Sequence, residues 1–152
     1  MDRALDRLSQ LPGTRMYGPS DRSGRLCVIA FNLGQLPHAL VSAILSQEWA
    51  IGTRSGCFCA HPYVKSLLGI DESAAVALER AILAGDRSAM PGAVRVSLGL
   101  SNTLEASDRL GDALEAIAAR RYGRDDGPEP EPGGCIPGSG DTRPSACAHP
   151  RT

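Results

Sequence analysis

Apolar residues along the chain follow the spacings of strands in some places and of helices in others. Residues 27–31 form a short unbroken apolar run, which predicts a central strand covered on both faces. Residues 94–98 alternate apolar and polar side chains, which predicts a strand that directs Arg95 away from its aliphatic face. Shorter extended segments are expected at 15–17 and 51–53. The sequence therefore predicts four strands.

Three segments have the spacing of helices. The first begins near Pro37 and links two of the strands. The second covers 74–83 and is stopped by Gly85, and the third begins where Asn102 and Glu105 resemble a capping pair. The apolar stripes are Val76, Ala77, Ala81 and Ile82 in the second segment and Leu110, Ala113, Leu114, Ile117 and Ala118 in the third. Helices and strands in this order predict an α/β fold, a small mixed sheet flanked by helices.

Composition divides the chain near Tyr122. The last 30 residues, 123–152, contain six Gly, six Pro and a single large aliphatic residue. Such a segment buries too little apolar surface to offset the entropy of ordering it. We therefore expect one folded domain at 1–122 and a disordered Gly/Pro-rich tail at 123–152.

Charge narrows the classes of partner. The chain has 152 residues and a net charge of −1, from 16 basic and 17 acidic residues, with no basic cluster of the kind that binds nucleic acid. Its apolar stretches are too short for a membrane span, and its first residues lack the apolar core of a secretory signal. The expected location is the cytoplasm, with no nucleic-acid or membrane partner.

The richest cluster of reactive side chains lies at 56–62, Gly-Cys-Phe-Cys-Ala-His-Pro. In extended geometry Cys57, Cys59 and His61 would lie on one side, as in half of a zinc site, but a closed site needs a fourth ligand. A reactive thiolate needs a nearby cation and exposure to solvent, and Arg54 is a candidate cation for Cys59. Cys27 opens an apolar strand and is interpreted as a small core residue.

Two basic residues add to the candidate chemistry. Arg95 is suited to grip a carboxylate through two parallel hydrogen bonds, although a solvated or ion-paired surface arginine fits the same pattern. Lys65 is the only lysine, so chemistry that requires a lysine amine must use Lys65 or take place elsewhere.

Five motifs occur in an order that resembles a known family. They are Tyr-Gly-Pro at 17–19, Val-Ile-Ala-Phe-Asn-Leu-Gly at 28–34, the loop at 54–62, Val-Arg-Val-Ser-Leu-Gly-Leu-Ser-Asn-Thr at 94–103 and Asp-Arg-Leu at 108–110. Together they resemble the C-terminal small domain of class V aminotransferases, in the cysteine desulfurase and selenocysteine lyase-like branch. The resemblance covers Tyr17 to about Ile117 and implies the C-terminal domain fold of fold-type I pyridoxal-phosphate enzymes.

The resemblance assigns roles to three residues. It implies that Cys59 is the catalytic nucleophile that takes sulfur from a cysteine bound to pyridoxal phosphate, that Arg54 heads its loop on the substrate side, and that Arg95 holds the substrate carboxylate. Two positions depart from the pattern: Cys57 stands where desulfurases often have histidine, and Ser101 where an aromatic residue is usual.

The resemblance also implies that the cofactor residues lie outside this chain. The family's cofactor lysine, its aspartate and its phosphate ligands belong to a large domain N-terminal to the small one. Pyridoxal phosphate is therefore expected by resemblance only, and is not expected to be held by this chain alone. The first expectation is a partial enzyme, inactive alone, that works with a large domain supplied in trans or that self-associates. The alternatives are a non-catalytic interaction module or remnant and, with less support, a metal-binding domain.

Overall fold

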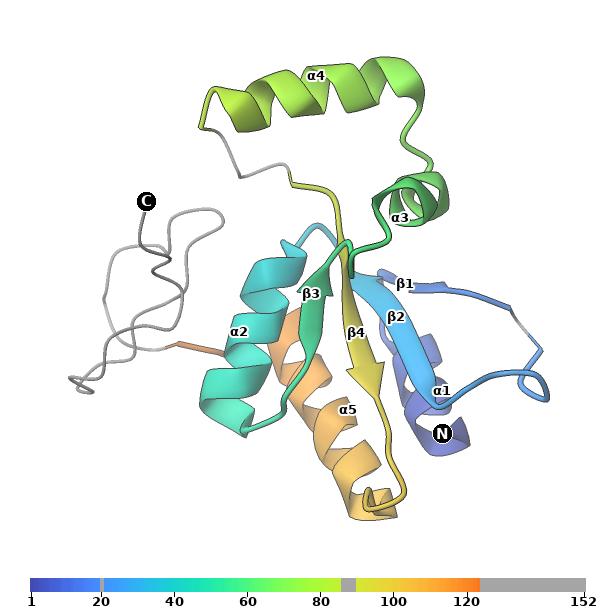
Figure 1. Ribbon diagram of the computed structural model, residues 1–152. Coiled ribbons are helices and arrows are strands. Elements are labelled where there is room, and N and C mark those ends of the chain that lie inside the picture. Colours follow the sequence, from blue (N-terminus) through green and yellow to red (C-terminus); the bar gives the residue numbers. More distant parts are fainter. Residues whose placement is uncertain (20, 86–89, 124–152) are drawn as a thin grey trace, which may run out of the picture.

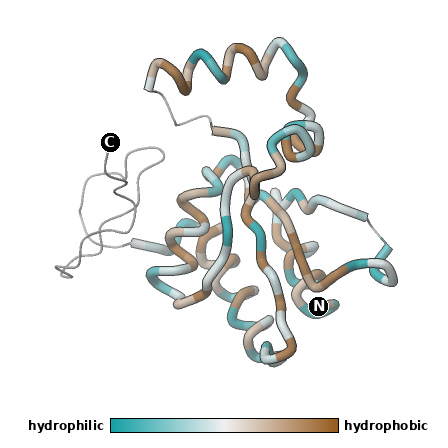
Figure 2. Tube along the Cα trace, in the orientation of Figure 1, coloured by the Kyte–Doolittle hydropathy of each residue, from teal (hydrophilic) through white to brown (hydrophobic). Residues whose placement is uncertain are grey.

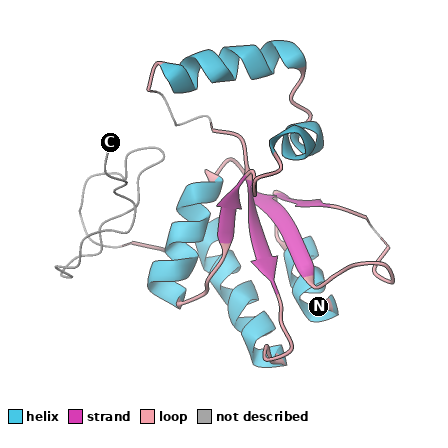
Figure 3. Cartoon of the chain, viewed as in Figure 1, coloured by secondary structure: helices cyan, strands magenta, loops and turns pink. Residues whose placement is uncertain are grey.

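The computed structural model describes residues 1–19, 21–85 and 90–123, and its four strands form one sheet in the order β1-β2-β4-β3 (Figure 1). The strands are β1 (Thr14–Tyr17), β2 (Val28–Leu33), β3 (Arg54–Gly56) and β4 (Ala93–Ser97). The helices are α1 (Asp2–Gln10), α2 (His38–Trp49), α3 (His61–Leu68), α4 (Glu72–Leu83) and α5 (Leu104–Ala118). Helices α1, α2 and α5 cover one face of the sheet, whereas α3 and α4 lie beyond one end of it (Figure 3).

The α/β class is confirmed, but the expected mixed sheet is antiparallel in every pair of the described strands. Strands β2 and β3 run in the same direction and are joined through α2, as in a parallel unit. They are not neighbours, because β4 lies between them and runs antiparallel to both. The third strand lies at Arg54–Gly56, directly after the expected segment at 51–53, which is not part of a strand.

The core lies on one face of the sheet only. In β2, Ile29, Phe31 and Leu33 are buried, while Ala30 and Asn32 on the opposite face are half-buried. The expectation of a strand covered on both faces was therefore wrong, because the core helices pack on a single face. The remaining core side chains come from α1, α2, α5 and β4 and include Leu8, Val41, Leu45, Val94, Val96, Leu114 and Ile117.

Most of the apolar stripe expected on helix α5 is confirmed. Four of the five residues are buried, and Ala118 is exposed at the C-terminal end. The cap differs from the expected pair, since Thr103 Oγ1 accepts a hydrogen bond from the Ala106 N–H at 3.4 Å. Asn102 instead closes the preceding turn, where its Oδ1 accepts from the Gly99 N–H at 2.6 Å.

Helix α1, which the pattern analysis missed, packs against α5. Its Ala4, Leu5 and Leu8 are buried. Arg7 reaches across to Asp112 and Glu115, each at 2.7 Å. The first residues are therefore part of the folded unit.

Helix α4 has no buried residue, so the expected stripe at 76–82 does not face the core. Val76 is 45% exposed and Leu83 is 82% exposed. Figure 2 shows hydrophobic and hydrophilic positions along the whole helix. The helix begins at Glu72 because Asp71 caps it, with Oδ1 accepting from the Ala74 N–H at 2.8 Å.

Two sequence predictions concern the limits of this unit. None of the helices in the described part of the chain is long and apolar enough to cross a membrane. Apart from Gly123, the predicted tail at 123–152 lies outside the described residues, so both the tail and the domain boundary stay predictions.

Candidate functional site

A row of four paired residues crosses the face of the sheet opposite the core. Tyr17 pairs with Ala30, Ala30 with Arg95, and Arg95 with Arg54. Directly paired residues of antiparallel strands share a face, and Val94 and Val96 fill the core on the other one. The expected direction of Arg95 is confirmed, and the sheet places the two candidate arginines side by side.

Neither guanidinium has a carboxylate partner among the described residues. Arg95 is half-buried, its Nε is buried without a hydrogen-bond partner in the described part of the chain, and its Cζ lies 5.2 Å from the ring centroid of Phe58. Like charges on directly opposite residues repel, and a buried donor without a partner costs free energy. An anion bound here would reduce both costs.

Polar side chains extend the site along β1 and β2. Asn32 Nδ2 donates to Tyr17 Oη and to the Gly92 carbonyl, each at 3.0 Å, while Asn32 Oδ1 is buried without a partner among the described residues. The Arg15 guanidinium lies 5.3 Å from the centroid of the Tyr17 ring. Asn32 and Tyr17 were not predicted from the sequence as site residues. The available signal was the polar Asn32, which stands between the apolar run at 27–31 and Leu33.

The cysteine loop is a tight turn and not an extended segment. The Ala60 N–H donates to the Cys57 carbonyl at 2.8 Å, Phe58 and Cys59 have φ of 53° and 61°, and α3 begins at His61. The extended geometry that would place Cys57, Cys59 and His61 on one side is therefore not adopted. Within 1–19, 21–85 and 90–123, no group of three or more His, Cys, Asp or Glu is placed to hold a metal ion.

The two cysteines of the turn have different surroundings. Cys59 is exposed, whereas Cys57 is half-buried and its Sγ donates to the Pro91 carbonyl at 3.1 Å. Burial raises the pKa of the Cys57 thiol, and the charge of Lys65 opposes this in part. Cys57 therefore stays a protonated donor over a wider pH range, and Cys59 is the accessible thiol.

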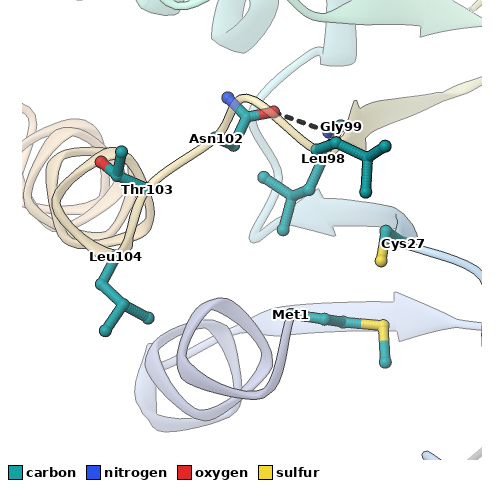
Figure 4. A pocket seen from close by; sticks show the side chains of 8 residues that line it. Met1, Cys27, Leu98, Gly99, Asn102, Thr103 and Leu104 are labelled. Carbon is teal, nitrogen blue, oxygen red and sulfur yellow. Dashed lines mark hydrogen bonds between the residues drawn. The ribbon is translucent and has the colours of Figure 1, made fainter.

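Cys27 is also exposed, which corrects its interpretation as a core residue. It precedes the first residue of β2 and lies at the end of the sheet, where it lines a hollow of about 450 Å³ with Met1, Leu98 and the residues that lead into α5 (Figure 4). Exposure alone therefore does not distinguish Cys59 from Cys27. Their neighbours do, because Cys59 follows Phe58, whose ring contacts Arg95, whereas Cys27 lines the hollow with Met1 and Leu98.

A second hollow, of about 410 Å³, lies between the start of α2, the α3–α4 segment and Met90–Gly92. His38 lines it and shares a hydrogen bond of 3.1 Å between Nε2 and the Met90 carbonyl. Burial lowers the pKa of His38, against an opposing effect of that bond. Arg54, Cys59 and Arg95 do not line this hollow.

Residues 1–110 match the family model for aminotransferase class-V. The chain belongs to this family. The match covers the whole sheet, the cysteine turn and the first part of α5. The recognition made from the motifs is confirmed at this level.

The similar proteins include cysteine desulfurases. Over 117 residues the chain is 35% identical to the cysteine desulfurase of Yersinia pestis (strain Pestoides F) and 34% identical to that of Klebsiella pneumoniae. Each alignment covers 77% of this chain but 23% of the relative, so the chain spans about a quarter of the relatives' length. An apo cysteine desulfurase structure from Thermococcus onnurineus matches 78% of this chain and 24% of its own, with a TM-score of 0.60 and 26% identity. A cysteine desulfurase from Escherichia coli, covering 78% of this chain and 23% of its own, shares the fold at a TM-score of 0.55 and 24% identity.

Members of the aminotransferase class-V family use pyridoxal phosphate. A Schiff-base lysine works from a pocket that also holds the cofactor. Lys65 lies in the last turn of α3, acts electrostatically on Cys57, and lines neither hollow. The described residues therefore do not fit a pyridoxal-phosphate site, and we assign no cofactor step to them.

Proposed function

We propose that this chain is the small-domain part of a cysteine desulfurase-like enzyme, in which Arg95 binds the substrate carboxylate and Cys59 accepts the sulfur. The observation that carries the proposal is the open face of the sheet. Arg54 and Arg95 lie side by side there without an acidic partner among the described residues, next to the turn that exposes Cys59.

The roles follow from the chemistry of each side chain. The planar edge of the Arg95 guanidinium matches a carboxylate, and the charge of Arg54 on the paired position adds to the attraction. Cys59 adjoins Phe58, whose ring contacts Arg95, so acceptor and carboxylate site are neighbours. This arrangement suits a small amino acid whose carboxylate and sulfur are held by the two residues. Breaking the carbon–sulfur bond is left to cofactor chemistry supplied elsewhere in the enzyme.

A chimera tests these roles directly. The chain replaces the matching segment of the Yersinia pestis cysteine desulfurase, and the purified protein is given L-cysteine. We expect alanine as the product together with a mass gain of one sulfur atom on Cys59, and release of that sulfur as sulfide once a thiol reductant is added. Arg95→Gln should raise KM roughly ten- to a hundredfold, the cost of hydrogen bonds to a charged group.

Two cysteine variants separate the acceptor from its neighbour. Cys59→Ser should abolish sulfur capture, whereas Cys57→Ser should keep it because Cys57 faces Pro91. Full sulfide release by Cys59→Ser, or sulfur found mainly on Cys57, would contradict the assignment.

The cofactor and partner follow from the same proposal. The open face of the sheet is covered by a large cofactor-binding domain, on the same polypeptide or another, and the chain taken alone is inactive and prone to self-association. Mixed with pyridoxal phosphate, the chain should give no stoichiometric imine absorbance, and an imine lost in Lys65→Ala would contradict this.

Size-exclusion chromatography with light scattering tests the self-association. A stable monomer whose melting temperature ignores the large domain would favour an independent interaction module.

A further inference from the structure

Phe58 has a backbone conformation that bulky residues avoid. Its φ is 53°, and Cys59 follows with a φ of 61°, so two successive residues other than glycine are left-handed. Such conformations are uncommon, and they persist where the surrounding structure holds them. The contacts that hold this turn therefore bear on its function.

Two side chains fasten the turn, and both reach the segment that forms β4. Cys57 Sγ donates to the carbonyl of Pro91, just before the strand, at 3.1 Å. The Phe58 ring lies 5.2 Å from Cζ of Arg95, within the strand, at a distance where a cation and an aromatic ring attract each other. The turn that carries Cys59 is thus tied to the strand that carries Arg95.

The ring and a carboxylate use different parts of Arg95. A carboxylate binds the N–H edge of a guanidinium, in the plane of that group. In a cation–π contact, the charged group lies over the face of an aromatic ring. Both contacts can therefore exist at once. A carboxylate held through two hydrogen bonds fixes the position of the guanidinium, and the ring that contacts it is fixed in turn.

We propose that Phe58 is a positioning residue that couples carboxylate binding at Arg95 to the placement of Cys59. This rests on the proposed function, because it takes Arg95 as the carboxylate site and Cys59 as the acceptor. With Arg95 empty, the strained turn is held by Cys57 and by a guanidinium that no ligand fixes. With Arg95 occupied, the turn is restrained at both Cys57 and Phe58, and the acceptor thiol is set in place when a substrate is present.

The test is a nuclear magnetic resonance titration of the full chain with L-alanine, which supplies the carboxylate and amino group of an amino-acid substrate without its sulfur. In the unaltered chain, the backbone amide signals of Arg95 and Cys59 should shift together with one Kd. In Phe58→Leu, the Arg95 signal should still shift, with a Kd raised about two- to fivefold, while the Cys59 signal stays in place. Phe58→Tyr keeps the ring and should restore both responses.

Controls separate coupling from general disturbance. Tyr63→Leu removes an aromatic ring that is 63% exposed on α3 and should titrate like the unaltered chain. Should Phe58→Leu fail to fold, Phe58→Met, which also lacks the aromatic ring, should likewise uncouple Cys59 from the ligand. A Cys59 shift that persists in Phe58→Leu, or in Phe58→Met, overturns the coupling and leaves the proposed function standing. No shift at Arg95 in the unaltered chain overturns the coupling, whereas the proposed function is decided separately by the chimera.

Discussion

The two faces of the sheet are built from alternate residues of the same strands. They differ in how completely their apolar side chains are buried and their polar atoms hydrogen-bonded. On one face, Ile29, Phe31 and Val94 are fully buried beneath three helices. On the other, Arg95 and Asn32 each have a buried polar atom without a partner among the described residues. Stability is concentrated on the first face, and the capacity to bind a ligand on the second.

The largest expected effect comes from removing a side chain on the core face. Phe31→Ala should lower the free energy of unfolding by about 3–5 kcal/mol, through lost burial and the cavity left behind. Val28→Ala is the matched control, since Val28 lies on the opposite face of β2 and is 40% exposed. It should change stability by about 0.5 kcal/mol or less. Urea denaturation measures both, and equal losses would remove the distinction between the faces.

A smaller effect should distinguish α5, which packs on the core, from α4, which does not. Thr103→Ala removes the cap of α5 and should lower global stability by about 0.5–2 kcal/mol. Asp71→Ala removes the cap of α4 and should leave the urea midpoint unchanged while amide exchange in α4 becomes faster, because α4 can unfold without exposing the core.

Acid should act on α4 as the Asp71 substitution does. The hydrogen bond from the Ala74 N–H, aided by Ser73, lowers the pKa of Asp71. Its contribution is complete above the ordinary pKa of an aspartate and is lost as the pH falls through the lowered value. Amide exchange measured against pH, corrected for the intrinsic pH dependence of exchange, tests this. If Asp71→Ala lowered the urea midpoint as much as Thr103→Ala does, α4 would be part of the cooperative core.

The smallest effect concerns the paired arginines. Arg54→Gln removes one of two like charges on directly opposite residues and should raise the free energy of unfolding by about 0.2–1 kcal/mol at low salt. The gain should fade as added salt screens the repulsion. Arg109→Gln, at an exposed position of α5, is the control and should show no such gain. A loss of stability in Arg54→Gln at low salt would contradict the repulsion.

Local patterns predicted most of the elements, though not α1 or α3, and long-range pairing decided where the site lies. The alternation at 94–98 was enough to give the direction of Arg95, because period two is a property of the strand itself. The adjacency of Arg54 and Arg95 depends on the pairing of β3 with β4, which no local pattern contains.

The wrong predictions have the same origin. Cys27 and the apolar positions of α4 have the pattern of buried residues, but the core helices do not reach them. Helix α1 was missed because charged residues separate its buried Ala4, Leu5 and Leu8, whose spacing is nevertheless helical. For Cys27 and α4 the missing information was which surface another element covers, whereas the spacing that marks α1 was present in the sequence.

The central position of β4 has a consequence for the order of folding. Strand β3 has β4 as its sheet neighbour, and β2 pairs with β4 on the side away from β1, yet β4 is the last of the four described strands to be synthesised. Until it emerges, β3 and one edge of β2 have no hydrogen-bonded neighbour, and unpaired edges invite pairing with other chains. Closing the sheet also requires contacts between distant parts of the sequence, which slows folding. The nascent chain is therefore most prone to aggregate during the interval between the synthesis of β3 and that of β4.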